Sequence, residues 1–66
     1  MAKIMVYLSD SQTAGEMDAV EAHALVDYDL ARFDEQHEIR LDHQYTELSE
    51  AVQDLRFYRD GTPRSY

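Results

Sequence analysis

The chain has 66 residues, with 14 acidic and 6 basic side chains, a formal charge of −8 and no cysteine. A chain of this size forms one domain and removes only about 60% of its unfolded surface from water, so its core is thin. The missing cysteines exclude a disulfide framework, a cysteine-based zinc site and a thiol nucleophile. The negative charge opposes binding to nucleic acid or to an anionic membrane and favours a basic protein surface as the partner.

No apolar run in the sequence approaches the roughly 20 residues that a membrane span needs. The N-terminal segment 1–8 is also too short to be a signal peptide. We therefore expect a cytoplasmic protein.

The segment 3–8, with the sequence KIMVYL, predicts a β-strand. Ile4, Val6 and Leu8 alternate with other large side chains, so both faces are apolar or amphipathic, as in a strand that is covered on both sides. A lone strand cannot satisfy its own backbone groups. This one must pair with another segment of the chain or with a second copy.

The stretch from Glu16 to Asp60 contains neither glycine nor proline, the two residue types that break helices. Thr13 and Glu16 have the T-x-x-E spacing of a capping box, in which each side chain binds a free amide at the start of a helix. We therefore predict a long first helix that begins near Thr13.

Two apolar stripes run along opposite sides of this predicted helix. One stripe consists of Met17, Val20, Ala24, Tyr28 and Ala31, and the other of Ala19, Ala22, Val26, Leu30 and Phe33. A helix that is apolar on two sides needs a neighbour on each side. We therefore predict a homodimer with Val26, Leu30 and Phe33 at the dimer interface.

The segment 36–45 has two interpretations. Ile39 and Leu41 begin an alternation that is typical of a strand, whereas Leu41 and Tyr45 also continue a helical stripe. Periodicity over so few residues leaves both open. We prefer a break within residues 35–44, because a helix of more than about 40 residues is rare in a small domain.

A second helix follows this break and has one apolar face, formed by Tyr45, Leu48, Ala51, Val52 and Leu55. Asp60 and Gly61 then form a stop signal. The predicted fold is mainly α with a short N-terminal β-strand (α+β), in the order strand, long helix, charged connector and second helix. Residues 1–60 form a single domain and residues 61–66 a flexible tail.

Most acidic residues lie between Glu16 and Asp54, where only Arg32 and Arg40 oppose them. Carboxylates on rigid helices can imitate the phosphates of a nucleic acid and occupy a basic groove. We therefore predict a non-catalytic acidic binding protein that occludes a basic site on a partner, such as a nucleic-acid-binding protein. Inhibition by nucleic-acid mimicry, as in phage counter-defence or regulatory proteins, is one form of this function. The predicted partner-binding residues are Asp27, Asp34, Glu35, Glu38, Asp42, Glu47, Glu50 and Asp54.

Two other functions are consistent with the sequence. The first is a structural or regulatory dimerisation module, whose acidic surface serves only solubility and has no basic target. The second is a metal-binding helical protein, because His23 with Asp27 and Asp34 with His37 have helical spacings that could present two ligands each. No motif fixes a complete ligand set or a catalytic site, so we predict no enzyme activity, cofactor or metal.

Overall fold

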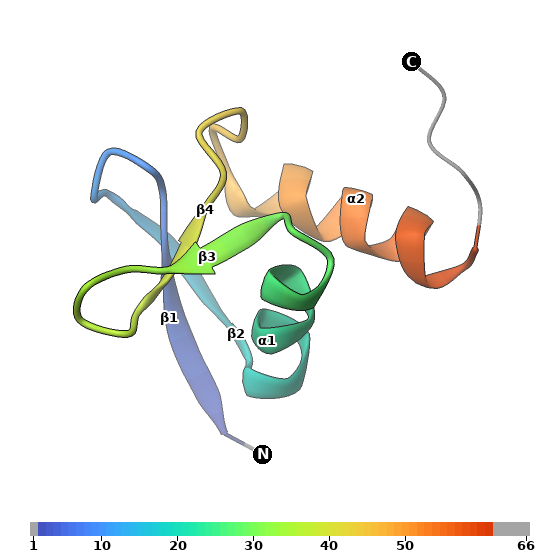
Figure 1. Ribbon diagram of the computed structural model, residues 1–66, viewed down its shortest axis with the longest axis horizontal. Helices are drawn as coiled ribbons and strands as arrows, with labels where there is room; N and C mark the ends of the chain where they lie inside the picture. The colour runs from blue at the N-terminus through green and yellow to red at the C-terminus, as the bar shows by residue number, and fades with distance from the viewer. Residues whose placement is uncertain (1, 62–66) are drawn as a thin grey trace.

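The computed structural model describes residues 2–61 and shows a small α+β domain with four strands and two helices (Figure 1). In chain order these are β1 (Lys3–Tyr7), β2 (Thr13–Asp18), α1 (Ala19–Asp27), β3 (Ala31–Phe33), β4 (Ile39–Leu41) and α2 (Leu48–Arg59). The strands form one mixed sheet in the order β2-β1-β4-β3. The prediction of a mainly α fold with a single short strand is therefore wrong. Apart from Gly61, the predicted tail 61–66 lies outside the described residues.

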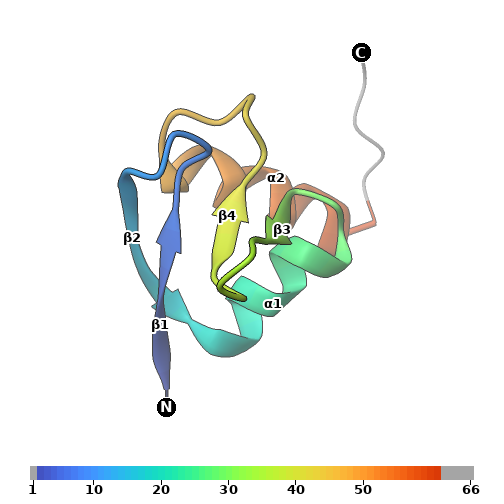
Figure 2. The same ribbon diagram turned by 60° about the vertical axis from the view of Figure 1, so that its left-hand side comes forward.

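Strand β1 forms where the sequence predicts it, and its partners lie in the same chain. It pairs antiparallel with β2 and parallel with β4, while β3 pairs antiparallel with β4. The predicted covering of both faces is not found, because both helices lie on the same side of the sheet (Figure 2). The open face exposes side chains such as Met5.

The predicted capping box at Thr13 and Glu16 is wrong, because both residues belong to β2. Between them, Gly15 has a φ of +148°, and a Cβ there would lie 3.3 Å from Leu48 Cδ2 of α2. Glycine thus allows α2 to approach β2 closely. Pairing with β1 and contact with α2 therefore override the local capping pattern.

Helix α1 begins later and ends earlier than predicted. The Asp18 side chain accepts a hydrogen bond of 3.0 Å from the Val20 amide and caps the first turn. At the other end Asp29 takes a φ of +63°, and the Leu30 amide donates a 2.8 Å bond to the Leu25 carbonyl. This is a Schellman ending with aspartate in the place that glycine usually takes. The helix therefore stops without any glycine.

The connection between β3 and β4 also turns without glycine, because His37 takes a φ of +61°. The His37 amide donates to the Asp34 carbonyl, and the Asp34 amide donates to the Glu38 carbonyl, both at 2.9 Å. The chain therefore reverses, and Ala31–Phe33 pairs with Ile39–Leu41. Of the two interpretations of segment 36–45, the strand is correct for residues 39–41.

The core lies between the inner face of the sheet and the two helices. Its buried side chains come from all six elements and from the segments beside them: Val6, Met17, Ala22, Leu25, Leu30, Ala31, Ile39, Leu41, Tyr45, Ala51 and Leu55. The predicted second helix is confirmed as α2, with Ala51 and Leu55 buried. Asp60 and Gly61 end it as the sequence predicts. Neither helix of residues 2–61 is long and apolar enough to span a membrane.

Candidate functional site

The eight acidic residues that the sequence assigns to partner binding do not form one surface. Asp27 ends α1, and three others occupy the β3–β4 turn, namely Asp34, Glu35 and Glu38. The other four follow β4, namely Asp42, Glu47, Glu50 and Asp54. The β3–β4 turn and the segment after β4 leave opposite ends of that strand (Figure 1). The two acidic groups therefore have to be considered separately.

In the β3–β4 turn the carboxylate of Asp34 is used inside the chain. Its Oδ1 accepts backbone hydrogen bonds from Gln36 at 2.9 Å and Glu38 at 3.0 Å, and its Oδ2 pairs with Arg40 at 2.6 Å. The hydrogen bond from the Glu38 amide is the main cause that lowers the pKa of Asp34, and the Arg40 guanidinium adds to it. Asp34 therefore stabilises the turn and is already paired with a cation.

Arg40 connects this turn to β1. Its Nη1 donates a 3.0 Å hydrogen bond to the Leu8 carbonyl, and its guanidinium carbon lies 5.6 Å from the centre of the Tyr7 ring. A hydrogen bond to the Glu38 carboxylate is the main cause that raises the pKa of Tyr7. Asp34 and Glu38 thus interact with groups of the same chain.

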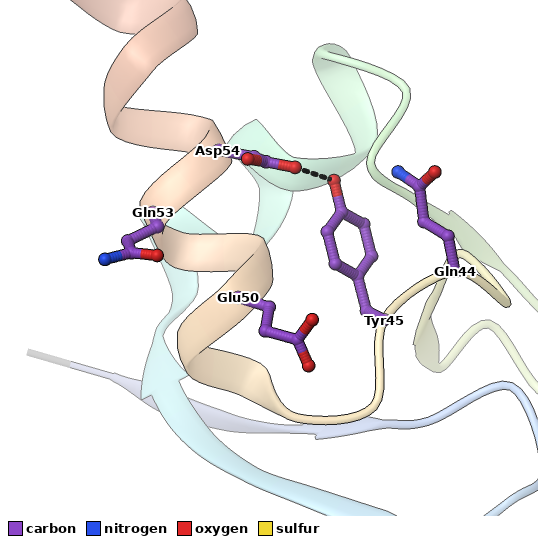
Figure 3. Close-up of a pocket in the computed structure, with 5 residues that line it drawn as sticks. All are labelled: Gln44, Tyr45, Glu50, Gln53 and Asp54. Carbon is purple, nitrogen blue, oxygen red and sulfur yellow. Dashed lines mark hydrogen bonds between the residues drawn. The ribbon is translucent and has the colours of Figure 1, made fainter.

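Two residues of the second acidic group, Glu50 and Asp54, line an open hollow of about 270 Å³ between α2 and the segment before it. We call it the α2 hollow, and its residues are Gln44, Tyr45, Glu50, Gln53 and Asp54. Glu50 and Asp54 point from α2 toward the Tyr45 ring, and Gln44 lies on the far side of that ring (Figure 3). The hollow therefore combines two carboxylates, two amides and an aromatic ring.

Local hydrogen bonds hold the side chains of the α2 hollow in place. Glu50 lies in the first turn of α2, and its Oε1 accepts from both the amide and the hydroxyl of Thr46. Tyr45 is buried, and its hydroxyl donates a 2.6 Å hydrogen bond to Oδ2 of Asp54. The Thr46–Glu50 bonds fasten the loop to the helix, and the tyrosine bond orients the second carboxylate.

The electrostatics of Glu50 differ from those of Asp34. The hydroxyl bond from Thr46 is the main cause that lowers the pKa of Glu50, so this carboxylate is ionised at neutral pH. Both bonds from Thr46 end on one oxygen, Oε1. The ion pairs of residues 2–61 are Arg40 with Asp34 and His43 with Asp42, so Glu50 has no cationic partner among them.

A second hollow, of about 340 Å³, lies between the segment after β1 and the segment before α2, and shares Tyr45 with the first. Asp10 is the one carboxylate in its lining, and the exposed His43 also contributes. The Asp10 side chain accepts the Gln12 amide and so serves its own turn. The α2 hollow is therefore the stronger candidate for binding a cationic group.

The three predicted dimer-interface residues have different environments. Leu30 is only 4% exposed and belongs to the chain's own core, and Val26 packs partly buried against that core. Phe33 is 45% exposed, with its ring centre 5.7 Å from that of His23. The far ends of the two predicted stripes lie in a strand, so the reasoning from one long helix no longer supports the dimer.

The histidine and aspartate pairs do not assemble a metal centre. No group of three or more metal-ligating side chains occurs within residues 2–61. His37 belongs to a turn, so its predicted helical spacing from Asp34 is not found.

Sequence reasoning missed Gln44 and Gln53 as site residues and assigned Tyr45 only to the core. The signal for the site was the T-x-x-x-E spacing of Thr46 and Glu50 just before an apolar helix face, a variant of the capping box. The two glutamines carry no comparable signal. Gln44 reaches the hollow through the turn at residues 42–45, and Gln53 reaches it from α2.

Comparison with known proteins adds no family or relative. The chain matches no protein-family model, no curated protein and no solved structure. Function must therefore be argued from the geometry of the α2 hollow.

Proposed function

We propose that this chain is a non-catalytic acidic binding protein that occludes a basic site on a partner protein. The observation that carries the proposal is Glu50, an ionised carboxylate held in an open hollow without a cationic partner among residues 2–61. A fixed carboxylate loses little side-chain entropy when it binds, so more of its interaction energy reaches the complex. The proposal includes the cytoplasmic location predicted from the sequence.

The α2 hollow suits a lysine or arginine side chain of the partner. A carboxylate forms strong, short hydrogen bonds with either cation, and the amides of Gln44 and Gln53 can accept further N–H groups. Asp54, which the Tyr45 hydroxyl orients, adds a second carboxylate to the lining of the hollow. The net charge of −8 would also steer a basic partner toward the chain.

Three carboxylates in a row support the nucleic-acid-mimic form of the proposal. Glu47 occupies the N-cap position of α2 without a side-chain capping bond, and Glu50 and Asp54 follow it three and seven positions later. The axial steps are about 4.5 and 6 Å at 1.5 Å per residue. One strand of DNA carries a charge about every 3.4 Å, so the row is a sparser version of that pattern.

The proposal is tested by capture of partner proteins from a cell lysate at low and at moderate salt. The wild-type chain should retain basic proteins and release them steeply as the salt concentration rises. Glu50→Gln should retain less, although glutamine keeps an acceptor oxygen for Thr46. Glu35→Gln is the matched control, because it removes the same charge from the β3–β4 turn. Equal retention by all three proteins would contradict the role of Glu50.

A second candidate function is a dimerisation module, and exposed apolar side chains favour it. Val20 of α1 is 71% exposed, and Phe33 at the edge of the sheet is 45% exposed. Burial of such side chains in a homodimer would extend the thin core. Light scattering at micromolar concentration should then show a dimer that Val20→Glu converts to a monomer. A wild-type monomer would reject this candidate.

A further inference from the structure

The outer face of α2 continues past the hollow to an exposed aromatic side chain. Glu50, Gln53, Asp54 and Phe57 occupy positions i, i+3, i+4 and i+7, so they share one face of the helix. Phe57 is 52% exposed and so offers an apolar surface on this face. This face, which we call the α2 outer face, is therefore acidic at one end and aromatic at the other.

The residues beside Phe57 lie off this face. Tyr58 follows Phe57, and its ring stacks on that of Tyr28, with 6.0 Å between the ring centres. Arg56 and Arg59 fall outside the α2 outer face at 100° per residue. The basic side chains of α2 are thus turned away from the carboxylates, and the face has one sign of charge.

We propose that the α2 outer face binds a basic amphipathic helix of the partner protein. This inference rests on the proposed function and specifies its partner. Basic side chains of the partner helix lie over Glu50 and the α2 hollow, and an apolar side chain packs on Phe57. The negative charge of Glu50 complements the basic end of the partner helix, and the exposed Phe57 ring complements its apolar end.

The spacing of the two ends favours a helix over an extended peptide. Glu50 and Phe57 are seven residues apart on α2, which is about 10.5 Å along the helix axis. A partner helix presents residues i and i+7 on one face at the same spacing. An extended strand presents same-face residues at about 6.7 or 13 Å, and neither value matches. A basic residue and an apolar residue seven positions apart on a partner helix can therefore contact Glu50 and Phe57 at the same time.

The test uses two synthetic peptides of identical composition, rich in arginine, leucine and alanine. One has the leucines on a single helical face beside the arginines, and the other is a scramble without such a face. Calorimetry at moderate salt measures the affinity of each peptide for the full chain. We expect the wild type to bind the amphipathic peptide about tenfold more tightly, because an aromatic anchor typically contributes that much.

Variants separate the two ends of the face. Phe57→Ser should remove the preference for the amphipathic peptide, while Phe33→Ser, which alters another exposed phenylalanine, should keep it. Glu50→Gln should weaken the binding of both peptides. Circular dichroism of each variant checks that the fold is intact, and Phe57→Leu serves as a conservative variant that keeps the preference.

The outcomes distinguish this inference from the proposed function. If both peptides bind the wild type equally and Phe57→Ser behaves like Phe33→Ser, the amphipathic-helix inference is overturned while the acidic binding function stands. If neither peptide binds the wild type, the proposed function fails and the inference fails with it.

Discussion

Asp34 in the β3–β4 turn and Glu50 in the α2 hollow are both carboxylates with a lowered pKa, yet they serve different purposes. Asp34 uses both oxygens within the chain and is paired with Arg40. Glu50 uses one oxygen for Thr46 and has no cationic partner among residues 2–61. An acidic composition therefore does not locate a binding surface. The fold separates a carboxylate that is already paired, such as Asp34, from one that a hollow presents without a cationic partner, such as Glu50.

The two acidic regions depend on one core, so the largest expected effect is the loss of both together. Leu25 is fully buried, and Leu25→Ala should lower the free energy of unfolding by about 3 kcal/mol. A domain of this size has a total stability of only about 3 to 10 kcal/mol. Chemical denaturation should show a midpoint shifted strongly toward lower denaturant. An unchanged midpoint would show that α1 does not pack as described.

Substitution of Asp34 should mainly lower stability, whereas substitution of Glu50 should mainly weaken binding. Asp34→Ala removes the acceptor of two turn amides and the partner of Arg40, so the melting temperature should fall by several degrees. Glu50→Gln keeps an oxygen for Thr46, so its melting temperature should stay close to that of the wild type while binding of a basic peptide weakens. Thermal melts and calorimetry measure these two effects. A larger loss of stability in Glu50→Gln than in Asp34→Ala would contradict the structural role of Asp34 and the binding role of Glu50.

The pH dependence of stability should show the contributions of Asp34 and Glu50. Their ordinary pKa values are 3.8 for Asp34 and 4.5 for Glu50, and the folded chain lowers both. Each contribution to stability is therefore fully present above the ordinary pKa and is lost as the pH falls through the lower folded value. Urea denaturation should show stability falling below about pH 4.5. Asp34→Asn should flatten the lower part of this fall, and an unaltered profile would contradict the role of Asp34.

The smallest expected effect concerns the end of α1. Asp29 occupies a left-handed position that glycine adopts without steric cost. Asp29→Gly should therefore raise the free energy of unfolding by about 0.5 kcal/mol. Gly61 already has this type of conformation at the end of α2, so Gly61→Ala is the opposite control and should destabilise. A destabilised Asp29→Gly would show that the aspartate side chain itself has a role there.

The aspartate at the end of α1 also explains why the long first helix was predicted wrongly. The absence of glycine and proline from Glu16 to Asp60 indicated continuous helix, but Asp29 and His37 adopt positive φ values without glycine. These two residue types tolerate that region better than most others. A turn of this kind has a weak sequence signal, because aspartate and histidine also occur on the surfaces of helices. The alternation at Ile39 and Leu41 was visible but too short to decide the interpretation.

The parts of the fold with strong local signals were predicted correctly. The strand β1 and the helix α2 each have a clear apolar pattern, and Asp60 with Gly61 marks the end of α2. For the candidate site, the sequence identified Glu50 and Asp54 as acidic positions, but with six others of equal weight. Only the fold shows that Asp34 is paired internally and that Tyr45 joins the two carboxylates in one hollow.

The location of the binding surface can be measured directly by titrating the isotope-labelled chain with an arginine-rich peptide and following its backbone amide signals. We predict that the largest shifts occur at Gln44, Tyr45, Glu50, Gln53 and Asp54, which line the α2 hollow. The amides of residues 35–37 in the β3–β4 turn should shift little, since Asp34 beside them is already paired with Arg40. Shifts centred on the β3–β4 turn, or spread evenly over all acidic segments, would contradict the account.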